Sequence, residues 1–290
     1  MTIRKFSVLM FVFALITLVV SLSGCEKAME MMPDDQTPGI TIGVAVAETG
    51  DNAVPYGLPM LRGLELAQEQ LNMAGANIMF ERVDNMSTLD GSKAAIQALV
   101  DAGVPAIIGV GISTQLKEAF PIAQAAGVVA LSPISSAAGL SGEVGDYAFR
   151  VGLATNILIP RGVMQTHAAL DYDTAAIIYD SADTYSTSVK DELEKALMEA
   201  GVTISATEMF VTADIDFTMQ LDAINTDSPD VLFVAALSTQ MVQIIMQAGD
   251  HAIASRLIVP DLTSGEVMAA SDAAENAIAF AGWSELDESP

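Results

Sequence analysis

The residues best placed to do chemistry lie in short polar turns, and the first of these turns spans residues 109–115. Its glycines, Gly109 and Gly111, free the backbone, and Ser113 and Thr114 stand where a helix is expected to begin. A helix N-terminus offers unpaired N–H groups and the positive end of a dipole, which suit an anion. The turn therefore predicts a carboxylate site, although an ordinary helix cap uses the same residue types.

A second hydroxyl-rich turn at 132–136 contains Ile134, Ser135 and Ser136 and follows the next expected strand. In open α/β sheets, ligands bind outside the carboxyl ends of the strands. We therefore expect Ser136 to face the same crevice as Ser113.

The second half of the chain offers groups of the opposite character. The turn at 180–185 ends with the aromatic Tyr185, and the turn at 260–263 contains the carboxylate of Asp261. An anion site in one half and a carboxylate in the other would together satisfy a zwitterion. This combination predicts a free amino acid as the ligand.

Enzymatic interpretations of the 109–115 turn fit less well. A dinucleotide fingerprint needs a third glycine after Gly109 and Gly111, and a hydrolase elbow needs glycine where Gln115 stands. A secreted serine hydrolase using Ser113 is thus a remote alternative. We expect no enzymatic activity, no catalytic residue and no cofactor.

Metal chemistry has few ligands to draw on in this sequence. Cys25 is the single cysteine, and His167 and His251 are the only histidines. A cysteine-based zinc site, a histidine cluster and an internal disulfide are therefore excluded. We expect no metal site.

Apolar runs that read as strands alternate with segments of helical spacing from residue 40 onward. The expected strands are 40–47, 78–83, 106–110, 128–131, 147–151, 174–179, 202–210, 231–237, 256–259 and 277–283. The expected helices are 56–73, 91–101, 114–126, 156–170, 184–200, 217–225, 239–248 and 264–270.

This alternation predicts an α/β protein with parallel sheets covered by helices. A stretch without periodicity at 139–150 divides the pattern into two similar halves. We expect two Rossmann-like lobes joined by a hinge, at 39–152 and 153–274. Residues 275–290 are expected to return toward the first lobe.

Charge and composition narrow the range of partners. The 290 residues include 12 Lys plus Arg and 37 Asp plus Glu, a net charge of −25. Such a chain repels phosphate backbones, so we expect no nucleic-acid partner. A hydrophobic content of 51% is too high for a disordered chain.

The first 25 residues predict an extracytoplasmic location. Arg4 and Lys5 precede an apolar run at 6–22, and Leu22-Ser23-Gly24-Cys25 resembles the bacterial lipobox. This predicts a lipoprotein signal peptide at 1–24, a lipid anchor on Cys25 and a tether at 25–38. An uncleaved membrane anchor is the alternative.

The order and spacing of short elements from residue 40 to the C-terminus resemble the type 1 periplasmic binding proteins. The specific resemblance is to branched-chain (Leu/Ile/Val-type) amino-acid receptors of ABC transporters. The elements that carry it include Thr49-Gly50, Pro55-Tyr56-Gly57, Ala106-Ile107-Ile108-Gly109, Ser113-Thr114, Leu131-Ser132-Pro133, Tyr147-Ala148-Phe149-Arg150, Ile178-Tyr179-Asp180, Asp214-Ile215-Asp216-Phe217 and Ser228-Pro229-Asp230-Val231.

The resemblance implies roles for single residues. Ser113 and Ser136 would hold the ligand carboxylate, with help from the Thr114 amide, and the Ile134 backbone and neighbouring Ser135 would contact the ligand. Asp261 falls where the family places an acidic residue on the α-ammonium group. Tyr185 and Tyr56 fall on aromatic residues that line the site.

The resemblance also implies a function and its partners. The chain would be a membrane-anchored substrate-binding lipoprotein that captures an amino acid or related small carboxylate and delivers it to an ABC permease. A ligand sensor of the same fold is the alternative. The sequence departs from the pattern at Asp261, which is shorter than the usual glutamate, at Leu237-Ser238, where an aromatic residue is common, and at Ser186, where glycine is frequent. The chain also stops before the family's last elements, as a C-terminally truncated form would.

Overall fold

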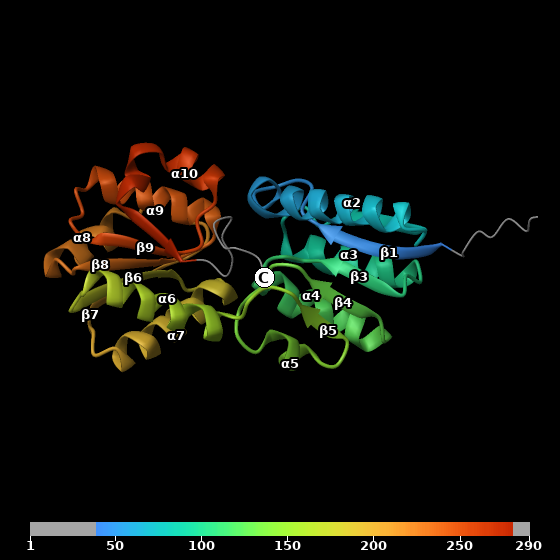
Figure 1. The fold of residues 1–290 in the computed structure, drawn as a ribbon, viewed down its shortest axis with the longest axis horizontal. Coiled ribbons are helices and arrows are strands. Elements are labelled where there is room, and N and C mark those ends of the chain that lie inside the picture. The colour runs from blue at the N-terminus through green and yellow to red at the C-terminus, as the bar shows by residue number, and fades with distance from the viewer. Residues whose placement is uncertain (1–38, 281–290) are drawn as a thin grey trace, which may run out of the picture.

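The computed structural model describes residues 39–280, which form two α/β lobes side by side (Figure 1). Each lobe contains a five-stranded sheet in which every strand pair is parallel. This confirms the predicted fold class. The expected signal peptide, the tether, Cys25 and the last ten residues lie outside the described part of the chain.

The first lobe has the strand order β2-β1-β3-β4-β5. Its strands are β1 (Ile40–Val46), β2 (Ile78–Asp84), β3 (Ala106–Gly109), β4 (Val129–Ser132) and β5 (Ala148–Arg150). Its helical segments are the π-helical turn η1 (Ala53–Gly57), α2 (Leu58–Met73), α3 (Leu89–Asp101), α4 (Ser113–Ala126) and α5 (Leu140–Val144).

The second lobe has the strand order β10-β9-β8-β6-β7. Its strands are β6 (Thr174–Asp180), β7 (Thr203–Phe210), β8 (Val231–Ala235), β9 (Arg256–Pro260) and β10 (Ala277–Phe280). Its helical segments are α6 (Thr155–Leu170), α7 (Thr184–Glu199), α8 (Thr218–Asp227), α9 (Ser238–Asp250), α10 (Ser264–Ala270) and the 3-10 turn η2 (Ser271–Asn276).

Strand β10 bears on the expected domain boundaries. Its residues fall in the range 275–290, which we expected to return toward the first lobe, but they pair with β9 at the edge of the second sheet. Residues beyond Phe280 are not described, so the destination of that segment and the lobe boundaries stay predictions.

The second lobe buries both faces of its sheet. Successive residues of a strand point to opposite faces, so Ala176 and Ile178 enter one cluster with α8 and α9, while Ala175 and Ile177 enter another with α6 and α7. In α9 the buried residues Met241, Ile244, Ile245 and Ala248 follow helical spacing. Apolar periodicity thus accounts for the two-sided packing.

The first lobe buries its two sheet faces unequally. One face packs against α3 and α4 in a large cluster that includes Leu99 and Phe120. On the other face, Val44, Val46 and Leu61 form a small cluster beneath α2. The first lobe therefore has one large core, whereas the second lobe has two.

The strands of both sheets end at the boundary between the lobes (Figure 1). At the end of β3, Gly109 has a φ of +148°, and a Cβ there would lie 2.0 Å from the Ala45 carbonyl oxygen. Only glycine fits such a close approach. It lets the chain turn from β3 toward α4, which places the start of α4 at the cleft.

Candidate functional site

A cavity of about 820 Å³ lies between the two lobes, at the carboxyl ends of the strands. It is lined by Pro55, Tyr56, Pro59, Met60, Gly63, Leu64, Gly111, Ile112, Ser113, Pro133, Ile134, Ser135, Ser136, Tyr185, Ala236, Leu237, Met241, Pro260, Asp261, Thr263 and Glu266. Seven of the eight residues expected to bind ligand are in this set, and Thr114 is the exception. The turns that the sequence singled out therefore meet at one place.

The first-lobe wall presents the N-terminus of α4. Ser113 is the first residue of that helix, and the preceding Ile112 provides no side-chain cap. The first-turn amides of a helix have no partner within the helix. This wall therefore offers backbone donors and a positive dipole end to the cavity.

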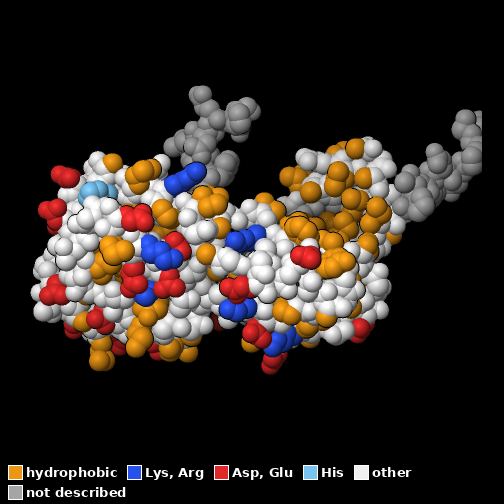
Figure 2. Space-filling model, turned by 90° about the horizontal axis from the view of Figure 1, so that it is seen from below, with side chains coloured by type: hydrophobic (Ala, Val, Ile, Leu, Met, Phe, Trp, Pro, Cys, Tyr) orange, Lys and Arg blue, Asp and Glu red, His pale blue; other side chains and the backbone are white. Residues whose placement is uncertain are grey.

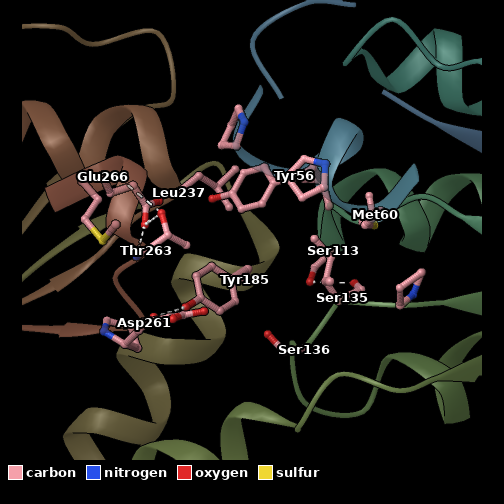
Figure 3. A pocket seen from close by; sticks show the side chains of 18 of the residues that line it. Tyr56, Met60, Ser113, Ser135, Ser136, Tyr185, Leu237, Asp261, Thr263 and Glu266 are labelled. Atoms are coloured by element: carbon pink, nitrogen blue, oxygen red, sulfur yellow. Dashed lines mark hydrogen bonds between the residues drawn. The ribbon is translucent and has the colours of Figure 1, made fainter. Parts of the chain in front are cut away.

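Hydroxyl groups surround this helix end (Figure 3). The Ser113 Oγ lies 3.0 Å from the Ser135 Oγ and 3.4 Å from the Ala137 amide nitrogen, which donates to it. Ser136 lines the cavity beside them, and its carbonyl accepts a hydrogen bond from the Thr155 amide at 2.8 Å. The Ser113 and Ser135 side chains are thus held in place before any ligand arrives.

The second-lobe wall presents a carboxylate, Asp261, directly after β9. Asp261 has a φ of +87°, an uncommon conformation for a residue with a side chain, and its amide donates to the Phe280 carbonyl at 3.1 Å. Shielding from water raises the pKa of Asp261, and the nearby charge of Glu266 raises it further. A cation at this wall would relieve both effects.

Glu266 is a site residue that sequence reasoning missed. It lines the cavity from the first turn of α10, and its Oε2 accepts hydrogen bonds from the amide (2.6 Å) and hydroxyl (2.8 Å) of Thr263. Thr-x-x-Glu is the pattern of a capping box and could have been read from the sequence. None of the lining residues of this cavity is Lys, Arg or His.

Tyr185 lies beside Asp261 (Figure 3). Its hydroxyl donates to the Pro260 carbonyl at 3.3 Å, and burial raises its pKa. The ring therefore stays neutral and forms a fixed part of the wall.

Tyr56 reaches from the first lobe to the second. It lies in η1, and π-helical turns often occur at functional sites. Its hydroxyl accepts a hydrogen bond from the Ser238 amide at 2.7 Å, at the start of α9. Burial raises the pKa of Tyr56. Tyr56 therefore both lines the cavity and caps a helix of the opposite lobe.

Thr114 also connects the lobes, outside the cavity lining. Its hydroxyl donates to Asp183 Oδ1 at 2.7 Å and accepts from the Thr184 amide at 2.7 Å. A further cross-lobe bond joins the Ala138 amide to Ser188 Oγ at 2.9 Å. The Thr114 side chain holds α4 against α7, and a role for its amide toward ligand stays a prediction.

Residues 39–280 also include possible metal ligands and the two histidines. No group of three His, Cys, Asp or Glu side chains within this range could hold a metal ion. His167 stacks edge-on against Tyr172, and His251 lies 3.3 Å from Thr218 Oγ1 and from Asp222 Oδ1. Neither histidine lines the cavity that contains Ser113.

Three solved structures share this architecture. LivJ from Streptococcus pneumoniae, in complex with isoleucine, has a TM-score of 0.78 and 24% identity over 86% of this chain and 73% of its own. A leucine-binding LivK from Thermotoga maritima has a TM-score of 0.73 and 19% identity over 81% and 67%. A solute-binding protein from Rhodopseudomonas palustris, in complex with 3,4-dihydroxybenzoic acid, has a TM-score of 0.69 and 19% identity over 79% and 63%.

At these identities the structural likeness establishes the fold, and a sequence profile establishes the family. The profile that matches is described as periplasmic binding protein, and it covers residues 39–290. This range includes both sheets and every residue that lines the cavity. The chain therefore belongs to the periplasmic binding protein family.

Proposed function

We propose that this chain is the extracytoplasmic substrate-binding component of an ABC uptake system. Its lobes would close by hinge motion around a free amino acid, branched-chain-like, or a related small carboxylate. The closed form would then be presented to a membrane permease. The proposal involves binding only, since the Ser113 hydroxyl pairs with Ser135 and no histidine lines the cavity.

The polarity of the cavity is the observation that carries this proposal. The uncapped α4 N-terminus with Ser113 and Ser136 can accept a carboxylate, and Asp261 on the facing wall can accept an ammonium group. The lining contains no cationic side chain, so a ligand with two negative charges would have no positive partner and would be repelled by Asp261 and Glu266. The arrangement favours a zwitterion, and the complex of LivJ with isoleucine supports this class.

Thermal unfolding tests the proposal. We expect an amino acid at about a hundred times its Kd to stabilise residues 39–290 by about 2.7 kcal/mol, a rise in melting temperature on the order of 5–10 °C. The matched controls for leucine are 3-methylbutylamine, which lacks the carboxylate, and 4-methylpentanoate, which lacks the ammonium group. The proposal would be contradicted if 4-methylpentanoate stabilised the protein as much as leucine does. It would also be contradicted if no amino acid raised the melting temperature.

The proposal also places the protein at the cell envelope. Support comes from the sequence Leu22-Ser23-Gly24-Cys25, in which lipids on Cys25 would provide more than one acyl chain for stable anchoring. Within residues 39–280, none of the helices is long and apolar enough to cross a bilayer. We expect Cys25→Ser in the full chain to abolish thioether lipidation, read by mass spectrometry, with ligand affinity unchanged.

A further inference from the structure

The polar anchors occupy only part of the cavity, and the rest of its wall is apolar. Met60 and Leu64 come from one face of α2 in the first lobe, spaced one helical turn apart. Leu237 and Met241 come from the start of α9 in the second lobe. We call these four residues the apolar subsite.

The apolar subsite is accessible although the lobes are in contact. Tyr56 lies between Met60 and Leu237 in Figure 3, and its bond to Ser238 ties η1 to α9 beside them. Met60, Leu64 and Leu237 nevertheless remain partly exposed, and Ile134 keeps 37% of its surface accessible. This apolar surface is left for a ligand to cover.

The size of the cavity leaves room for a ligand larger than a small aliphatic amino acid. Cavities of roughly 300–1,000 Å³ take drug-sized ligands, and the 820 Å³ here lies in the upper part of that range. A small aliphatic amino acid held at Ser113 and Asp261 would leave the apolar subsite unfilled. Water gains little there, because a buried water molecule needs two to four polar partners.

Gly111 keeps the subsite open on the first-lobe side. A Cβ at this position would lie 2.8 Å from Ile134 Cδ1 and 2.9 Å from Met60 Cε. Any side chain there would push these two ends into the cavity. The two methionines add adaptability, because unbranched thioether side chains adjust to irregular shapes.

From these observations we infer that the preferred ligand is an amino acid with a bulky side chain, aromatic or of similar size, which fills the apolar subsite. This inference rests on the proposed function, keeps the amino-acid class, and replaces the branched-chain-like preference by a preference for a larger side chain. Each buried methylene-sized group contributes about fourfold in affinity. Phenylalanine should therefore bind at least about tenfold more tightly than valine.

Calorimetry of the wild-type protein with glycine, alanine, valine, leucine, isoleucine, phenylalanine and tryptophan tests the inference. We expect affinity to rise with apolar size and to be greatest for phenylalanine or tryptophan. Tighter binding of valine, leucine or isoleucine than of both aromatic amino acids would overturn the inference and leave the proposed function standing. If no member of the series binds, the proposed function fails and the inference fails with it.

A variant pair locates the effect at the apolar subsite. Leu64→Trp fills the subsite, so we expect it to weaken phenylalanine binding at least about tenfold while alanine binding changes less than about twofold. Leu66→Trp is the matched control, because Leu66 lies on the exposed face of the same helix. The inference would be contradicted if the folded Leu64→Trp variant lost affinity for alanine and phenylalanine equally. It would also be contradicted if the variant lost affinity for neither.

Discussion

The two lobes share a five-stranded parallel sheet, yet they differ in how fully the sheet is covered. In the second lobe both faces lie under helices and both contribute large buried clusters. In the first lobe a row of apolar residues crosses four neighbouring strands, formed by Val44, Ile108, Leu131 and Phe149. Phe149, on the edge strand, is 50% exposed. Figure 2 shows a broad area of apolar side chains on the first lobe.

The lobes also differ in the chemistry of their cavity walls. The first lobe supplies hydroxyls and the N-terminus of α4, whereas the second supplies Asp261 and Glu266. Yet the strands of both lobes end at the same cleft. The comparison teaches that parallel strands of the same direction bring turns to the cleft in both lobes, while the coverage of the sheet and the polarity of the turns differ between them.

The largest expected effect tests the difference in coverage. Leu232, buried in the larger cluster of the second lobe, and Leu61, in the small cluster beneath α2, form a matched pair. Because a cavity beneath α2 can collapse or hydrate, we expect Leu61→Ala to cost about 2 kcal/mol and Leu232→Ala about 4–5 kcal/mol in unfolding free energy. Hydrogen exchange of the β1 and β8 amides measures the unfolding free energy of each lobe separately. Equal losses of unfolding free energy in the two variants would refute the difference in coverage.

The next effect sharpens the contrast between the walls. Asp261→Asn removes the charge opposite the ligand ammonium, and we expect a loss of about 1.5–3 kcal/mol in binding free energy. Ser113→Ala removes one of several donors, and we expect about 1 kcal/mol. Calorimetry with the best-binding amino acid checks both. Asp272→Asn, an exposed second-lobe change outside the cavity, serves as control. If Asp261→Asn and Ser113→Ala both bound the amino acid as tightly as the wild-type protein, the site assignment would be rejected.

Smaller effects are expected from the bonds that hold the lobes together. Thr114→Val, in the first lobe, leaves Asp183 and the Thr184 amide short of a partner, and Ser188→Ala, in the second, does the same to the Ala138 amide. We expect each to weaken binding by about 1 kcal/mol by destabilising the closed state. Small-angle scattering of the ligand-free variants should show a larger radius of gyration, and an unchanged radius in both would exclude a closing role.

The smallest effect is a pH dependence that belongs to the second-lobe wall alone. The raised pKa of Asp261 would fall when a ligand ammonium binds, so binding releases protons near that pKa and affinity decreases as pH drops through it. We expect this decrease in affinity at acidic pH to be smaller than the loss caused by Thr114→Val, and calorimetry across a pH series measures it. Asp261→Asn should flatten the profile, whereas Ser113→Ala should retain it.

Much of the fold could be predicted because its signals are local. Apolar runs such as Val231–Ala235 and helical spacing in α9 follow from which faces become buried. The sequence did not reveal that η1 is a separate π-helical turn before α2, because the expected helix at 56–73 begins inside that turn and continues without a break through α2. The position of β10 depends on its pairing with β9, which no local pattern specifies.

The site was predictable to the extent that it consists of strand-to-helix turns. Ser113, Ser136 and Asp261 were found because parallel strands bring their carboxyl ends to one edge. The contact of Thr114 with Asp183 joins residues 69 positions apart and exists only because the lobes meet. The sequence analysis did not identify the apolar subsite, because Met60 and Leu64 lie within the expected helix at 56–73 and no local pattern distinguishes an apolar residue that lines a cavity from one that packs in a core.

Two hydroxyl groups of the first lobe cap two helices of the second lobe, which makes the contact between the lobes measurable. The Ser238 amide depends on Tyr56, and the Thr184 amide depends on Thr114, so separation of the lobes returns both protons to solvent. These two backbone protons, one at each of two second-lobe helices, therefore act as built-in reporters. Their deuteration rates would measure how often the lobes of the ligand-free protein separate, without any attached probe.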